Sequence, residues 1–191
     1  MIVPAPDHPI RHFADDAAIR RIGTAFLDHS LPAADWTHEA HLGTCAWLQI
    51  ERPDIDPPRD LPRLISTFNV AKGTVNDDKS GYHETITQAY AIGVRTFLDA
   101  HSEGTLCERI NALLSGPTGA RDWPLRFWSR DVLFSVTARR GWVEPDLAPL
   151  PGRGVFNGTG AARATADRPR QPPAIALRAS GHPRCDRGDN A

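Results

Sequence analysis

Cysteine is scarce in this sequence, and its placement excludes two classes of small stabilised domain. Only three cysteines occur in 191 residues, at Cys45, Cys107 and Cys185. They are odd in number, far apart and without a CxxC pair, which argues against a disulfide framework and excludes a zinc knuckle. Such use of cysteine is typical of proteins in a reducing compartment, so we expect a cytoplasmic location.

The sequence also lacks long apolar runs and a large excess of either charge. No run approaches the about 20 apolar residues that a membrane span requires, so no membrane partner is expected. The first seven residues, MIVPAPD, contain neither a basic region nor an apolar one, so we expect no secretory signal. The net charge is −1, which does not favour nucleic acid as a partner. A chain of 191 residues is long enough for one domain with a sizeable core.

The composition changes near residue 151. From Gly152 to Ala191 there are seven arginines, no lysine and three aspartates, in a segment rich in Gly, Pro and Ala. Such a segment buries too little apolar surface to offset its ordering entropy. We therefore predict a helical domain over 1–151 and a disordered tail over 152–191. A basic arm for nucleic acid is the less favoured alternative, because Phe156 is the only aromatic residue there. A solvated tail or a frame-shifted end of the reading frame fits better.

The apolar pattern of residues 15–139 is helical. Apolar residues recur at three- and four-residue spacing, and no stretch alternates convincingly as a strand would. Asp15 and Ser80 are the expected N-caps of two of these helices, and Pro124 suits a first helical turn. We therefore predict an all-α fold, a single-domain bundle of about five to six helices. The predicted helices cover residues 15–29, 35–51, 60–71, 82–100, a segment around 106–115, and 124–139.

Two histidines lie at the start of the second predicted helix. In the segment WTHEAHL, His38 and His41 are three residues apart, so they share one helix face with Leu42 and Cys45. Two imidazoles at this spacing can reach one metal ion. The segment is not an HExxH motif, because the second histidine comes one position too early.

A third histidine lies at the start of the fourth predicted helix. In the segment GYHETIT, His83 falls on the apolar face that carries Ile86 and Tyr90, and Thr87 lies one turn further on, where it could orient the ring. Glu84 lies at the flank, where the positive end of the helix dipole favours a carboxylate.

These histidines are expected to meet. In an up-and-down bundle the second and fourth helices run parallel, so their N-termini lie at the same end. A helix N-terminus also disfavours imidazolium, and the neutral ring is the form that binds metal or acts as a base. We therefore predict that His38, His41 and His83 bind one divalent transition metal, Zn, Fe, Cu or Ni, with Glu84 nearby. His29 and the pair Asn76-Asp77 are expected at the same end.

Three functional hypotheses follow for this set. In the first, the chain is a metal-dependent enzyme that acts on a small-molecule ligand. In the second, His83 and Glu84 are catalytic residues of a metal-free enzyme that transfers protons on such a molecule. In the third, the chain is a ligand-binding or interaction module, and its histidines only bond main-chain groups or sense pH. Cys45 shares the histidine face, but we expect it to act as a small buried hydrophobe.

The two histidine segments also carry a resemblance. WTHEAHL and GYHETIT, with Phe68-Asn69 and the segment GTVN before the second, resemble a group of small uncharacterised bacterial proteins. The resemblance covers about residues 13–151, and it implies an all-α domain in which these segments occur together. It implies no activity, and the tail lies outside the pattern.

Deleting residues 152–191 should leave the melting temperature nearly unchanged, because a tail without a core contributes little to folding stability. Differential scanning calorimetry of the full and shortened chains measures this. A drop of many degrees would show that the tail packs on the helical domain.

Overall fold

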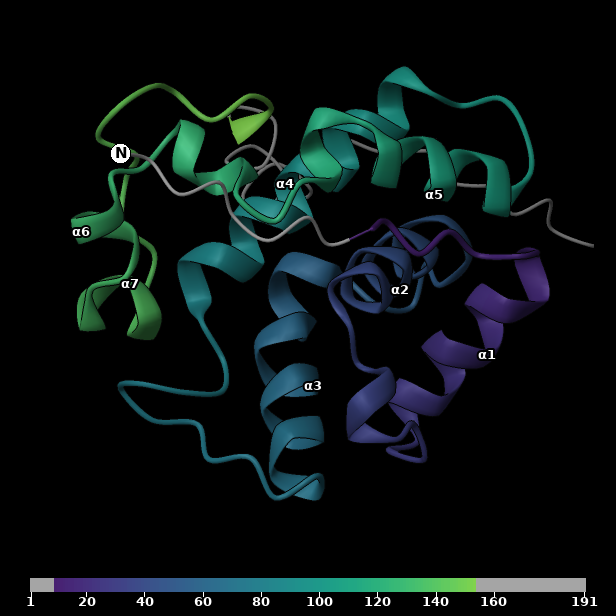
Figure 1. Cartoon of the computed structure of the whole chain (residues 1–191), viewed down its shortest axis with the longest axis horizontal. Helices are drawn as coiled ribbons and strands as arrows, with labels where there is room; N and C mark the ends of the chain where they lie inside the picture. The colour runs from purple at the N-terminus through teal and green to yellow at the C-terminus, as the bar shows by residue number, and fades with distance from the viewer. Residues whose placement is uncertain (1–8, 154–191) are drawn as a thin grey trace, which may run out of the picture.

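The structure is a computed structural model, which describes residues 9–153 (Figure 1). Helices and short 3-10 turns are the regular elements of this part, so the predicted all-α class is confirmed. The predicted tail lies outside the described residues except for Gly152 and Arg153. The helices are α1 (Asp16–Leu27), α2 (His38–Glu51), α3 (Pro57–Ala71), α4 (Glu84–Ala100), α5 (Leu106–Ser115), α6 (Arg130–Leu133) and α7 (Val136–Arg140), and the 3-10 turns are η1 (Ala33–Asp35), η2 (Pro117–Gly119) and η3 (Trp123–Arg126).

Side-chain caps begin the helices near the predicted positions. The Asp15 carboxylate accepts the Ala18 amide hydrogen at the start of α1, as expected. The Thr37 hydroxyl accepts the Ala40 amide hydrogen at the start of α2. Helix α3 begins at Pro57, three residues before the predicted start, because proline is tolerated in a first turn. Helix α1 ends at Leu27, and His29 has a positive φ of 64°.

The predicted helix over residues 124–139 is wrong. The structure contains η3, α6 and α7 in its place. The Ser129 hydroxyl accepts the Val132 amide hydrogen, and the Ser135 hydroxyl accepts that of Ala138, so each serine begins a new short helix. A serine side chain that bonds a nearby amide competes with continuation of the helix.

The predicted N-cap of α4, Ser80, is also wrong, because His83 takes this position. The His83 Nδ1 atom accepts the Ile86 amide hydrogen at 3.3 Å, and its Nε2–H donates to the Leu133 carbonyl at 3.0 Å. Ser80 instead donates to the Val75 carbonyl within the loop. His83 therefore connects the start of α4 to the end of α6.

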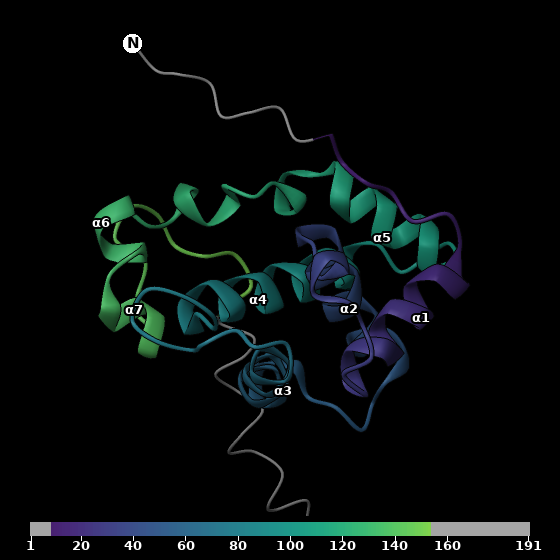
Figure 2. The same cartoon turned by 60° about the horizontal axis from the view of Figure 1, so that its bottom comes forward.

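The long helices cross one another rather than running side by side. In Figure 1, α3 runs vertically and α5 horizontally, while α2 is viewed close to its axis. After rotation, α4 lies across the view with α2 beside it (Figure 2). The expected parallel pairing of α2 and α4 at one end of the bundle is therefore not the arrangement observed.

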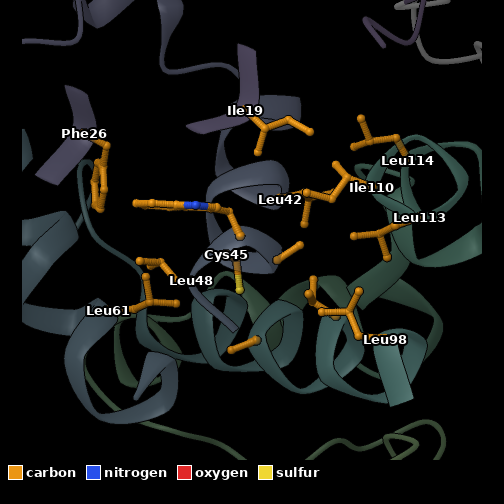
Figure 3. Close-up of a cluster of buried hydrophobic side chains, with 14 of the residues drawn as sticks. Ile19, Phe26, Leu42, Cys45, Leu48, Leu61, Leu98, Ile110, Leu113 and Leu114 are labelled. Carbon is orange, nitrogen blue, oxygen red and sulfur yellow. The ribbon is translucent and has the colours of Figure 1, made fainter. Parts of the chain in front are cut away.

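The main core lies around α2. Leu42, Cys45 and Leu48 of α2 pack among side chains of α1, α3, α4 and α5 (Figure 3). A second cluster joins α4 to the C-terminal segments through Ile92, Trp123, Trp128, Leu133 and Leu150. Trp128 is fully buried and its Nε1–H donates to the Val143 carbonyl, so it is a packing residue.

No helix within residues 9–153 has the length and apolar character that a membrane span needs.

The last two described residues contact earlier parts of the chain. Arg153 pairs with Glu144 and lies over the Trp142 ring, and Gly152 approaches Thr96. Both residues therefore pack against the helical part, although the predicted tail begins at Gly152.

Replacing His83 with alanine should lower the free energy of unfolding by about 2–3 kcal/mol, because α4 loses its cap and the buried Leu133 carbonyl loses its donor. Ser80→Ala, at the predicted cap position, removes only exposed loop bonds and should cost about 0.5–1 kcal/mol. Urea unfolding measures both values. Equal losses in the two variants would contradict the assignment of the cap to His83.

Candidate functional site

A pocket of about 520 Å³ opens between the start of α2, the middle of α3 and the first turns of α4. Its wall combines an apolar surface with polar groups that come mainly from α2 and α4. The apolar part is formed by Trp36, Leu42, Leu61, Ile65 and Ile86, and the polar part by Thr37, His38, His41, Thr44, Cys45, Thr87, Tyr90 and Arg121.

The structure brings two of the three predicted metal ligands to this wall. His38 and His41 line the pocket, whereas His83 does not. Both ring nitrogens of His83 already have main-chain partners, so neither is free to bind a metal. Within residues 9–153, no group of three or more His, Cys, Asp or Glu side chains could hold a metal ion. The predicted three-histidine centre is therefore not assembled in the described part.

The predicted catalytic pair is also placed elsewhere. Glu84 accepts a hydrogen bond from the Tyr82 hydroxyl at 2.6 Å and another from the Gln88 amide at 3.0 Å. Gln88 also donates to the Pro58 carbonyl, so this network ties α4 to α3. Neither Glu84 nor His83 is a wall residue of the pocket. Helix α4 instead contributes its next turn, with Ile86, Thr87 and Tyr90, since α2 crosses it there.

The other residues that were expected near the three histidines, His29, Asn76 and Asp77, do not line the pocket. His29 lies with its ring edge toward Phe68, at 6.4 Å between centroids. Asn76 bonds the Asn69 side chain and the Tyr82 amide, and Asp77 caps a turn with Lys79 and Ser80. These contacts stabilise the connection between α3 and α4.

His38 is held with one bare ring nitrogen. Its Nε2 atom lies 2.8 Å from the Gly119 carbonyl oxygen, which can only accept, so Nε2 carries the proton and Nδ1 is unprotonated in the neutral ring. Gly119 reaches this position because it lacks a Cβ atom, which would clash with the Leu114 carbonyl. Burial lowers the pKa of His38, and the nearby Arg121 charge lowers it further, so the ring is neutral near pH 7.

In His41 the nitrogen without a hydrogen bond is Nε2, not Nδ1 as in His38. Its Nδ1–H donates to the Thr37 carbonyl at 2.7 Å, which leaves Nε2 bare. The Trp36 ring lies against the imidazole, with 3.8 Å between centroids. Burial lowers the pKa of His41 to about 4, so this ring stays neutral at physiological pH. The pocket therefore has two neutral imidazoles in its wall, each with a defined tautomer.

Two further wall residues carry buried polar atoms without a partner. The Thr44 hydroxyl and the Trp36 indole N–H have no hydrogen bond within the described part of the chain. Thr44 is 1 % exposed. A buried polar group without a partner costs about 1–3 kcal/mol, and a bound molecule is one way to supply the partner.

Tyr90 and Arg121 complete the polar wall. The Tyr90 hydroxyl donates to the Ala120 carbonyl at 2.7 Å, and its ring meets the His38 ring edge to face at 5.5 Å. Arg121 pairs with the Glu39 carboxylate at 3.3 Å. The sequence offered no signal for Arg121, because a single arginine in a loop has no helical register that would place it.

Cys45 lines the pocket but behaves as the expected packing residue. It is 5 % exposed, and its sulfur accepts a hydrogen bond from the Gln49 amide at 3.4 Å. Burial raises the pKa of this thiol to about 11, so the thiolate needed for nucleophilic attack is not formed near pH 7.

Comparisons of the chain with protein-family models, curated proteins and solved structures find no match.

His41 should make the stability of the protein depend on pH. The folded pKa of about 4 lies below the ordinary value of 6.5, so the unfolded chain binds the proton first on acidification. The stabilisation from neutral His41 is full above pH 6.5 and is lost as the pH falls to about 4, a change of about 3 kcal/mol. We expect His41→Gln to flatten this part of the curve of unfolding free energy against pH, measured by urea titration.

His101 provides a matched control for this measurement. Its Nδ1–H also donates to the carbonyl four residues earlier, that of Phe97, but the residue is exposed. His101→Gln is the control for the substitution itself, because it replaces an exposed imidazole that has the same kind of main-chain bond. An unchanged slope in His41→Gln would contradict a neutral His41.

Proposed function

We propose that the chain binds a small organic molecule in this pocket, where His41 accepts a hydrogen bond from the molecule and His38 accepts a proton. One observation carries the proposal: both rings belong to the pocket wall, and each donates its only N–H to a main-chain carbonyl, which leaves the opposite nitrogen without a hydrogen bond. A neutral imidazole with one bare nitrogen is the form that accepts a hydrogen bond or removes a proton.

The size and lining of the pocket support a small molecule as the ligand. A volume of about 520 Å³ falls within the range of small-molecule sites, which combine an apolar wall with a few placed polar groups. Leu61, Ile65 and Ile86 offer apolar contact, and Trp36 and Tyr90 offer aromatic contact. The bare nitrogens are acceptors, so they favour a molecule that presents a hydroxyl or another acidic hydrogen.

The two histidines have different strengths as bases. The larger lowering of the pKa belongs to His41, whose value of about 4 makes it a weak base suited to accepting a hydrogen bond. His38 is the better base. If it takes a proton from the ligand on Nδ1, the Nε2–H bond to Gly119 is already in place to stabilise the imidazolium. His41 would then position the ligand while His38 removes the proton.

A metal-dependent reaction is the second candidate. Metal-binding histidines usually donate the other ring N–H to a carbonyl or carboxylate, and both His38 and His41 do so here. The full three-histidine set does not fit, because His83 bonds main-chain groups with both nitrogens. A zinc, iron, copper or nickel ion would therefore be held by His38 and His41 and by groups of the ligand or water, and it would act as a Lewis acid.

Titration with 2-naphthol tests the proposal, because this probe joins an apolar ring system to one hydroxyl donor. We expect saturable binding at one site per chain, with the largest ¹⁵N NMR shift at Nδ1 of His38, which accepts the single hydroxyl hydrogen, and a smaller one at Nε2 of His41. Replacing His38 with glutamine removes the imidazole nitrogen that accepts this hydroxyl hydrogen, which should weaken binding about tenfold, the value of one lost hydrogen bond, and His41→Gln should weaken it less. His101→Gln is the control and should bind as the wild type does.

Zinc titration of the same labelled protein separates the two candidates. A tight one-to-one shift of both bare nitrogens, lost in His38→Gln, would favour the metal-dependent reaction. If neither 2-naphthol nor zinc changes these two resonances, the pocket is not the functional site.

A further inference from the structure

Arg121 differs from every other residue of the pocket wall. The two histidines are neutral, Cys45 is a thiol, and the remaining wall residues are uncharged. Arg121 is therefore the only wall residue of this pocket with a permanent charge, and no acidic side chain lines the pocket with it. A single positive charge on an otherwise apolar and neutral wall complements a ligand with one negative charge.

The Arg121 side chain is held by an ion pair but keeps further N–H donors for a second acceptor. Its side chain is 51 % exposed and makes one ion pair within the described residues, 3.3 Å to Oε1 of Glu39. A guanidinium group has five N–H donors in a planar fork, so most of them are available for a second acceptor. Glu39, only 8 % exposed in its side chain, fixes the fork and is not itself a wall residue of the pocket.

A second hollow adjoins the pocket at this point. It measures about 240 Å³, and Thr37 and Arg121 line it as well as the pocket. Arg11 also lines this hollow, together with one acidic residue, Glu39. Arg121 thus lies where the two spaces meet, and its exposure of 51 % places it at the rim of the pocket.

We infer that the ligand of this pocket is a small organic acid. This inference rests on the proposed function and adds the chemical class of the ligand. The carboxylate lies at the rim and accepts two parallel N–H bonds from Arg121, an arrangement that guanidinium groups favour. The apolar body lies against Leu61, Ile65 and Ile86, and a hydroxyl or other acidic hydrogen reaches His38 and His41. Arg121 is then a specificity-determining residue for an acid over its neutral analogue.

A matched pair of probes tests this inference: 6-hydroxy-2-naphthoate and 6-hydroxy-2-naphthamide, which differ in charge but hardly in size. Isothermal titration calorimetry should show the acid binding about tenfold tighter than the amide, because charge-assisted hydrogen bonds are about twice as strong as neutral ones. In Arg121→Met this ratio should fall to about one, while the affinity for the amide changes less than about twofold. Arg121→Lys keeps the charge without the fork and should give an intermediate ratio.

Arg126→Met is the control, because Arg126 is also exposed and lies outside the wall of the pocket. It should leave the ratio at its wild-type value, and melting temperatures verify that each variant is folded. Equal affinities for the two probes, or a ratio that survives Arg121→Met, would overturn the organic-acid inference and leave the proposed pocket intact. If neither probe binds the wild type, the inference and the proposed function both fail.

Discussion

Two hydrogen bonds between an imidazole and a main-chain carbonyl determine the chemistry available to this protein. A carbonyl oxygen only accepts, so the bonds from His38 to Gly119 and from His41 to Thr37 decide which nitrogen of each ring is protonated. The Thr37 carbonyl belongs to the same helix start as His41, whereas Gly119 comes from a distant turn, η2. The site therefore depends on the position of η2 as well as on α2, and the glycine allows that turn to pack closely on α5.

Much of the fold is predictable from the sequence because local signals decide it. Helices α1, α2, α4 and α5 follow the apolar periodicity, and the carboxylate of Asp15 and the hydroxyl of Thr37 begin two of them. The break between α6 and α7 is harder to predict, since Ser129 and Ser135 are compatible with a continuous helix unless their hydroxyls bond backbone amides.

The candidate site is only partly predictable. The spacing of His38 and His41 places both on one helix face, and both do line the pocket. The position of His83 depends on how α2 and α4 cross, and that angle is a property of packing between residues far apart in the sequence. His83 lies one turn before the segment of α4 that meets the pocket, and there its ring caps the helix. The contributions of Thr44 and Arg121 likewise depend on tertiary contacts.

Tyr90 has a consequence for how occupancy of the pocket is transmitted. Its ring packs against both hydrophobic clusters, and its centroid lies 5.5 Å from those of both His38 and Trp123. Displacing this ring would disturb the clusters on both sides at once, so it cannot move as an isolated gate. A molecule that displaces Tyr90 would therefore also disturb the packing around Trp123, whose ring centroid lies 5.5 Å from that of Tyr90, so this indole can report events in a pocket that it does not line.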